Sequence, residues 1–202
     1  MSEPRLVHWR GFDPDRFEAA HVTLERDSLR ARGTSLTPAY SLHYEVVTGA
    51  QWVTRELALR VEGDAAVRTL ALRRATDGTW ATHRTGPEAE STLPLPDLSD
   101  ALDCDLALCP VTNTMPILRN DLVPRARRRE PGTFDYVMAW VSVPDLVVHR
   151  SEQCYSVSDP VEGGTGALVH FATEGFSTTL EVDGDSLVVN YPGLARRTET
   201  IP

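Results

Sequence analysis

The stretch Tyr40-Ser-Leu-His-Tyr-Glu-Val46 alternates between apolar and polar residues over its whole length. One face of an extended chain would carry Tyr40, Leu42, Tyr44 and Val46, and the other Ser41, His43 and Glu45. Successive side chains of a β-strand point to opposite faces, so this stretch predicts a strand with one face on a core and one in water.

The same alternation recurs along the chain on both sides of this stretch. Further strands are expected at residues 52–61, 67–75, 79–84, 134–142, 146–150, 155–157, 167–173, 178–182 and 186–191. Asp77-Gly78 and Asp183-Gly184 lie between neighbouring strands, and Asp-Gly is a strong signal for a tight hairpin turn. We therefore expect an all-β, mainly antiparallel fold, in which a single curved sheet forms a half-open or flattened β-barrel.

Helical signals are scarce, so we expect one or two short helices at most. Residues 113–119 predict one, with Asn113 or Thr114 as its cap and Pro116 in the first turn. Residues 12–20 are expected to form only a short turn. The arginine-rich run at 125–129 is flanked by prolines and is interpreted as a solvated loop, with a phosphate or headgroup site as the alternative.

The length of 202 residues predicts a single domain over 1–202. Residues 20–95 and 130–195 each contain a strand that begins with tyrosine and an Asp-Gly hairpin. We interpret them as two similar halves, joined by the segment 96–129.

Composition excludes several classes of function. A net charge of −9 leaves no basic face for nucleic acid. The chain has no lysine, which removes lysine-based covalent catalysis. The histidines are scattered, so neither a metal site nor a cofactor is expected.

The cysteines and the apolar stretches of the sequence indicate where in the cell the protein is expected. Three cysteines without a C-x-x-C pair indicate free thiols in a reducing cytoplasm. No signal peptide and no transmembrane segment are expected, since no stretch approaches 18 apolar residues.

One charged side chain stands out on an apolar strand face. Alternation in residues 52–61 places Arg55 with Val53 and Leu57. A buried arginine pairs with an acid or with an anionic ligand. The residues predicted to bind a ligand are Arg55, Tyr44, Trp52, Asn113, Trp140 and Tyr155.

The segment from Asp103 to Arg119 is the densest in polar groups. Asp103 and Asp105 share a strand face, and we interpret them as solvated, as hydrogen-bonded to a neighbouring loop, or as a cation site. Arg119 is expected to reach one of these carboxylates. The prolines and hydroxyls between them predict a rigid plug or corner that closes one end of the sheet.

Two motifs in this segment resemble a known family. They are Asp103-x-Asp105-Leu106 and Pro110-x-Thr112-Asn113-Thr114-x-Pro116-Ile117-x-Arg119. With Trp9, Trp52-x-x-Arg55, Gln153-x-Tyr155 and Tyr191-Pro192-Gly193, they resemble the bacterial family described as putative glycolipid-binding proteins. The resemblance implies a lipoprotein-carrier-like curved sheet with an apolar interior that holds acyl chains.

Three functions follow as hypotheses. The preferred one is a cytoplasmic, cofactor-free protein that binds an apolar or amphipathic small molecule, such as a glycolipid, inside the sheet. The second is a cofactor-independent cyclase, isomerase or lyase, with Asp103, Tyr155 and Arg119 as its reactive groups. The third is a filled barrel that acts through its surface as a protein-interaction module.

Overall fold

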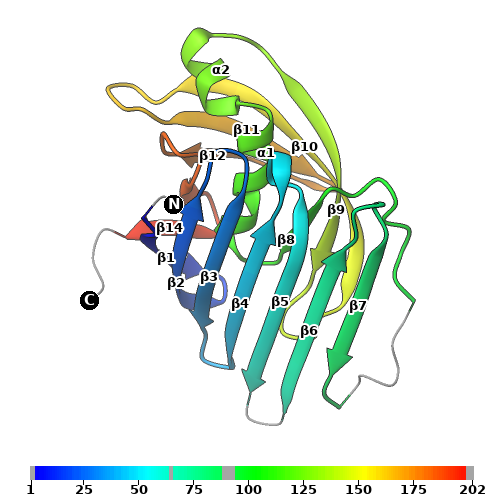
Figure 1. Cartoon of the computed structure of the whole chain (residues 1–202). Helices are drawn as coiled ribbons and strands as arrows, with labels where there is room; N and C mark the ends of the chain where they lie inside the picture. The colour runs from blue at the N-terminus through cyan, green and yellow to red at the C-terminus, as the bar shows by residue number, and fades with distance from the viewer. Residues whose placement is uncertain (1–2, 64–65, 88–93, 199–202) are drawn as a thin grey trace.

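A computed structural model describes residues 3–63, 66–87 and 94–198 as one strongly curved sheet with a short helical insert (Figure 1). The first seven strands are β1 (Arg5–Phe12), β2 (Asp15–Leu24), β3 (Leu29–Leu36), β4 (Tyr40–Thr48), β5 (Thr54–Gly63), β6 (Val67–Arg74) and β7 (Trp80–Thr85). The other seven are β8 (Asp103–Leu106), β9 (Thr133–Val141), β10 (Val148–Pro160), β11 (Ala167–Thr173), β12 (Phe176–Val182), β13 (Val188–Tyr191) and β14 (Ala195–Thr198). The expected all-β fold is confirmed.

The sheet consists of two meanders that meet at β1 and β14. Its strand order is β7-β6-β5-β4-β3-β2-β1-β14-β13-β12-β11-β10-β9-β8, and each pair is antiparallel except β8 with β9. The two ends of this order do not pair with each other, so the sheet curls without closing. Whether the halves 20–95 and 130–195 share an origin stays a prediction.

The curl brings the β8 edge against the start of β5. The Thr54 amide donates to the Leu102 carbonyl at 3.0 Å, and the Thr54 hydroxyl accepts from the Cys104 amide at 3.0 Å. The sheet therefore has two arms, the first formed by β1–β7 and the second by β8–β14. They face each other across a shared interior, which the apolar faces of their strands line. In β4, Leu42, Tyr44 and Val46 are buried, as the alternation predicts.

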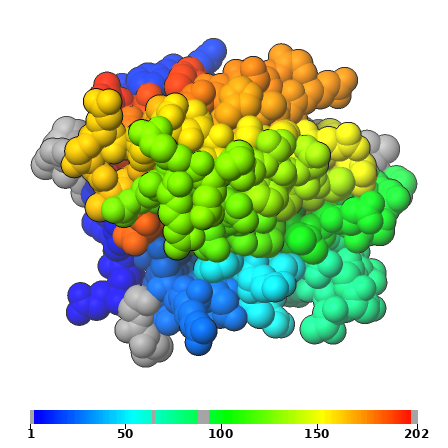
Figure 2. Space-filling model, turned by 90° about the horizontal axis from the view of Figure 1, so that it is seen from above, coloured from blue at the N-terminus to red at the C-terminus, as the bar shows by residue number. Residues whose placement is uncertain are grey.

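The helical insert fills part of this interior. It contains η3 (Pro110–Asn113), α1 (Thr114–Arg119) and α2 (Leu122–Arg128), and every residue from Cys109 to Ile117 is buried. In Figure 2 the green atoms of this region lie between the blue and cyan first arm and the yellow and orange second arm. The predicted plug and the helix at 113–119 are both confirmed.

Two local predictions are wrong. Residues 12–20 belong to the hairpin of β1 and β2 rather than to an isolated turn, because the alternation of β2 already begins at Arg16. Residues 125–129 are not a loop, since Arg125–Arg128 form the end of α2. Pro124 is compatible with this helix because it lies in the first turn, where amides lack intrahelical partners.

Within the described ranges, none of the helices is long and apolar enough to cross a membrane.

Candidate functional site

A network of buried polar side chains connects the insert to the second arm. Asp105 accepts hydrogen bonds from the Thr112 hydroxyl and from Gln153 Nε2, each at 2.7 Å. Burial raises the pKa of Asp105, while these two bonds partly offset that effect. The carboxylate retains unused lone pairs, since an ionised carboxylate can accept about four hydrogen bonds.

Tyr155 continues this network from the middle of β10. Its hydroxyl lies 3.0 Å from Asn113 Oδ1 and 3.2 Å from Gln153 Oε1, so one proton serves two acceptors. Burial, followed by the charge of Asp105, raises the pKa of Tyr155 well above its usual range. Tyr155 therefore stays a neutral donor, and it holds Asn113 and Gln153 in fixed orientations.

A cavity of about 320 Å³ opens over this network, on the inner face of β8–β13. Asp105, Asn113 and Gln153 supply its polar groups, and its aromatic walls are Trp140, Phe171, Phe176 and Tyr191. We call it the inner pocket. Ring-centroid distances of 6.0 Å for Phe171 with Tyr191 and 6.4 Å for Phe176 with Tyr191 show that these three rings form one cluster. Aromatic walls with a few fixed polar groups are typical of small-molecule sites.

Beside the network, Asp103 and Arg119 form a buried ion pair. Nη1 and Nη2 of Arg119 each donate to a carboxylate oxygen of Asp103 at 2.6 Å, and Nε donates to the Gln51 carbonyl at 2.9 Å. Burial alone would lower the pKa of Arg119, but the bonds and charge of Asp103 outweigh it and raise that pKa. The predicted contact of Arg119 with a carboxylate is confirmed, and this pair joins α1 to β8.

A second polar cluster lies on the first arm, and Tyr44 is its one member among the predicted ligand residues. The Tyr44 hydroxyl donates to Glu18 Oε1 at 2.8 Å, and the Cys109 thiol donates to the same oxygen at 3.2 Å. Burial raises the pKa of Glu18 to about 7, despite these bonds and the nearby charge of Arg16. Tyr44 is thus coupled to the insert through Glu18 and Cys109.

The structure separates the six predicted ligand residues. Asn113 and Trp140 line the inner pocket, and Tyr155 supports it through Asn113. Trp52 lies in η1 (Ala50–Trp52), a short helix that contacts α1 on the first arm.

The prediction that Arg55 lies on an apolar face is wrong, because its side chain is exposed. Val47 pairs with Glu56 and Thr48 with Thr54, so Arg55 is an extra residue on its strand. Such a β-bulge shifts the alternation by one residue, and here Thr54 points inward instead. Arg55 is therefore left out of the site.

Sequence reasoning missed Arg16, Glu18 and the aromatic walls at Phe171 and Tyr191 as site residues. Arg16 and Glu18 did carry a signal, since they share a strand face with Ala20 and Val22. That signal was hidden because residues 12–20 were interpreted as a turn.

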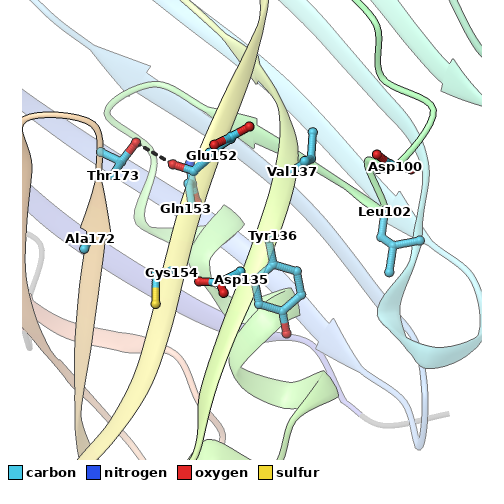
Figure 3. A pocket seen from close by; sticks show the side chains of 10 residues that line it. All are labelled: Asp100, Leu102, Asp135, Tyr136, Val137, Glu152, Gln153, Cys154, Ala172 and Thr173. Atoms are coloured by element: carbon cyan, nitrogen blue, oxygen red, sulfur yellow. Dashed lines mark hydrogen bonds between the residues drawn. The ribbon is translucent and has the colours of Figure 1, made fainter.

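A second, shallower groove lies on the outer face of the second arm (Figure 3). Its volume is about 610 Å³, and it is lined by Asp100, Leu102, Asp135, Tyr136, Val137, Glu152, Gln153, Cys154, Ala172 and Thr173. Figure 3 shows Asp100 and Leu102 on one side of the groove and the residues of β9–β11 on the other. Asp103, Asp105 and Asn113 do not line it. We treat the inner pocket as the candidate site, because the polar network converges there.

The candidate catalytic residues are already engaged with other protein groups. Asp103 and Arg119 bind each other, and neither lines the inner pocket. Among the described residues, no three His, Cys, Asp or Glu side chains lie close enough together to hold a metal ion.

Replacing Tyr155 with phenylalanine tests the role of its hydroxyl. Without that donor, the side-chain amide oxygens Asn113 Oδ1 and Gln153 Oε1 stay buried and lose the hydrogen bond that the Tyr155 hydroxyl donates. We expect a loss of about 1–3 kcal/mol in the free energy of unfolding, measured by urea denaturation. Tyr136→Phe, on the neighbouring strand, is the control: its half-buried hydroxyl lies 3.5 Å from the Pro116 carbonyl and also contacts Arg119, so its removal leaves no buried side-chain amide without a donor. Equal losses in both variants would contradict the assignment.

An open, curled antiparallel sheet that encloses a buried polar insert defines the structural class of this protein. The chain belongs to the family described as putative glycolipid-binding, whose model matches residues 6–197. It is similar to a DUF1089 family protein (PA1994) from Pseudomonas aeruginosa, for which a crystal structure is known. The two are 26% identical, with a TM-score of 0.66, over 90% of this chain and 92% of that one. Comparison with curated proteins gave no significant match.

Proposed function

We propose that the protein binds an amphipathic, glycolipid-like molecule and that its inner pocket receives the sugar. The observation that carries this proposal is the combination of aromatic walls with Asp105, Asn113 and Gln153 in one cavity of about 320 Å³. The family description points to the same class of ligand.

The chemistry of the pocket suits a sugar. Hydroxyl groups both donate and accept hydrogen bonds, so they can pair with the spare lone pairs of Asp105 and with the amides. The apolar faces of a sugar ring can pack on the rings of Trp140 and Tyr191, since aromatic side chains offer large, rigid apolar surfaces. Tyr155 fixes the amides in advance, which reduces the entropy lost on binding.

The rim of the pocket is apolar and suits a lipid chain. Leu194 and Phe176 lie on the pocket wall, and nearly half of the Phe176 surface is exposed. The Phe12 amide donates to the Leu194 carbonyl at 3.2 Å, and Phe12 is also exposed. We infer that an alkyl chain leaves the pocket across these side chains. Each methylene group that it buries contributes about 0.8 kcal/mol.

Trp140→Ala tests this function with octyl β-D-glucoside as the probe. Losing one aromatic wall should weaken binding by about tenfold or more, measured by isothermal titration calorimetry. Trp52→Ala is the matched control, because Trp52 lies in η1 and does not line the pocket. Equal affinity in wild type and Trp140→Ala, or an equal loss in both variants, would contradict the proposal.

A further inference from the structure

Arg16 is a buried cation that forms no ion pair with any residue that the structure describes. Its side chain lies on the inner face of β2, and only 3% of the residue is exposed. Its hydrogen bond goes from Nη2 to the neutral Leu108 carbonyl at 2.6 Å. Across the described part of the chain, Nε and Nη1 have no hydrogen-bond partner, and no carboxylate lies within 4.0 Å of the guanidinium.

The neighbouring acid, Glu18, compensates the charge of this cation only in part. Glu18 accepts hydrogen bonds from Tyr44 and Cys109 rather than from Arg16. Burial raises the pKa of Glu18 to about 7, so this carboxyl is about half protonated at neutral pH. Burying a charge without a partner is costly, so a bound anion would stabilise Arg16 at this position.

The chain makes specific room for the guanidinium. Gly11 lies opposite Arg16 in the register of β1 and β2, and a Cβ atom at Gly11 would lie 2.3 Å from Arg16 Nη1. Any other residue at Gly11 would therefore displace the cation. The position of the guanidinium is set by this glycine on one side and by the Leu108 carbonyl on the other.

These same contacts place Arg16 next to residues that line one end of the inner pocket, although Arg16 itself does not line it. Leu108, which accepts its hydrogen bond, lines that pocket. Leu194 also lines it, and the next residue, Ala195, is the strand partner of Gly11. The cation thus lies behind the wall that Leu108 and Leu194 form at this end of the pocket.

We propose that Arg16 is a binding residue for an acidic group, a carboxylate or a phosphate, carried by the amphipathic ligand of the inner pocket. This inference rests on the proposed function and narrows the ligand to an acidic glycolipid. A guanidinium whose Nε and Nη1 have no hydrogen-bond partner can donate charge-assisted hydrogen bonds to an oxyanion.

The test compares three probes on the full chain by isothermal titration calorimetry. Octyl β-D-glucoside is neutral, octyl β-D-glucuronide carries a carboxylate on the sugar, and octyl glucosyl phosphate carries a charged phosphodiester between sugar and chain. We expect at least one acidic probe to bind wild type about tenfold or more tightly than the glucoside. Arg16→Gln should abolish this preference, so that the acidic probes and the glucoside bind the variant with affinities within about twofold of each other. Arg10→Gln is the control, since Arg10 is an exposed arginine of the same hairpin.

The outcomes separate this inference from the proposed function. Glucoside binding without any preference for an acidic probe, or a preference that survives in Arg16→Gln, overturns the role of Arg16 alone. Absence of binding by all three probes overturns the proposed function as well. Binding of inorganic phosphate that is lost in Arg16→Gln, with no preference among the amphiphiles, would assign Arg16 to a free anion instead. If Arg16→Gln fails to fold, Arg16→Lys replaces it. This variant should reduce the preference for the acidic probes, because lysine keeps the positive charge but lacks the planar guanidinium with its several N–H donors.

Discussion

Asp103→Asn is expected to lower the free energy of unfolding by about 3–5 kcal/mol, the largest effect predicted for a single change in this chain. The substitution removes the charge that faces Arg119 and leaves the size of the side chain nearly unchanged. Arg119 would remain in place as a buried cation that keeps the asparagine Oδ1 and the Gln51 carbonyl as acceptors, while the asparagine NH₂ would face its other terminal nitrogen donor to donor. Breaking a buried pair from one side costs far more than the pair itself contributes.

Urea denaturation of both proteins at one pH measures this loss directly. Asp15→Asn is the matched control, because it breaks the pair of Asp15 with Arg10 on the surface. Exposed pairs contribute at most about 1 kcal/mol. A loss of less than about 1 kcal/mol in Asp103→Asn would mean that the insert is not fixed by this ion pair.

Stability should also fall as the pH rises between about 4.5 and 7, through the buried carboxyl of Glu18. In the folded chain burial raises its pKa from 4.5 to about 7. The folded state therefore binds more protons than the unfolded state in this window. The contribution of Glu18 to the free energy of unfolding is complete below pH 4.5 and is lost as the pH rises through 7. At 1.36 kcal/mol per pKa unit, the free energy of unfolding falls by about 3 kcal/mol in total over this window.

The Glu18→Gln variant isolates this effect, because glutamine does not titrate. The difference in unfolding free energy between wild type and variant should change by about 3 kcal/mol between pH 4.5 and 8. Other groups that titrate in this range cancel in the difference, since both proteins contain them. A difference that stays constant with pH would show that Glu18 is ionised throughout, as in an ion pair with Arg16.

The fold was largely predictable from the alternation of apolar and polar residues. The pattern of Tyr40–Val46 appears in the structure as β4, with its apolar side facing the interior. Because side-chain direction in a strand has a period of two, one correct face assignment fixes the others along that strand. The contact of Arg119 with a carboxylate was also predictable, since rigid segments flank both groups.

The position of Arg55 was not predictable, because a β-bulge of one residue leaves no clear mark in a single strand. It appears only in the pairing of β5 with β4, where Thr48 meets Thr54 and Arg55 has no partner. The inner pocket was only partly predictable for a similar reason. Phe171 and Tyr191 lie far from Asn113 in sequence, and they meet it only through the curl of the sheet.

A crystal structure of the protein with octyl β-D-glucoside tests the central claim most directly. We expect the sugar ring in the inner pocket, packed against Trp140 or Tyr191, with hydroxyl groups within hydrogen-bond distance of Asp105 and Gln153. The alkyl chain should leave past Phe176. A sugar bound in the outer groove beside Asp135 and Cys154, with the inner pocket empty, would contradict the account.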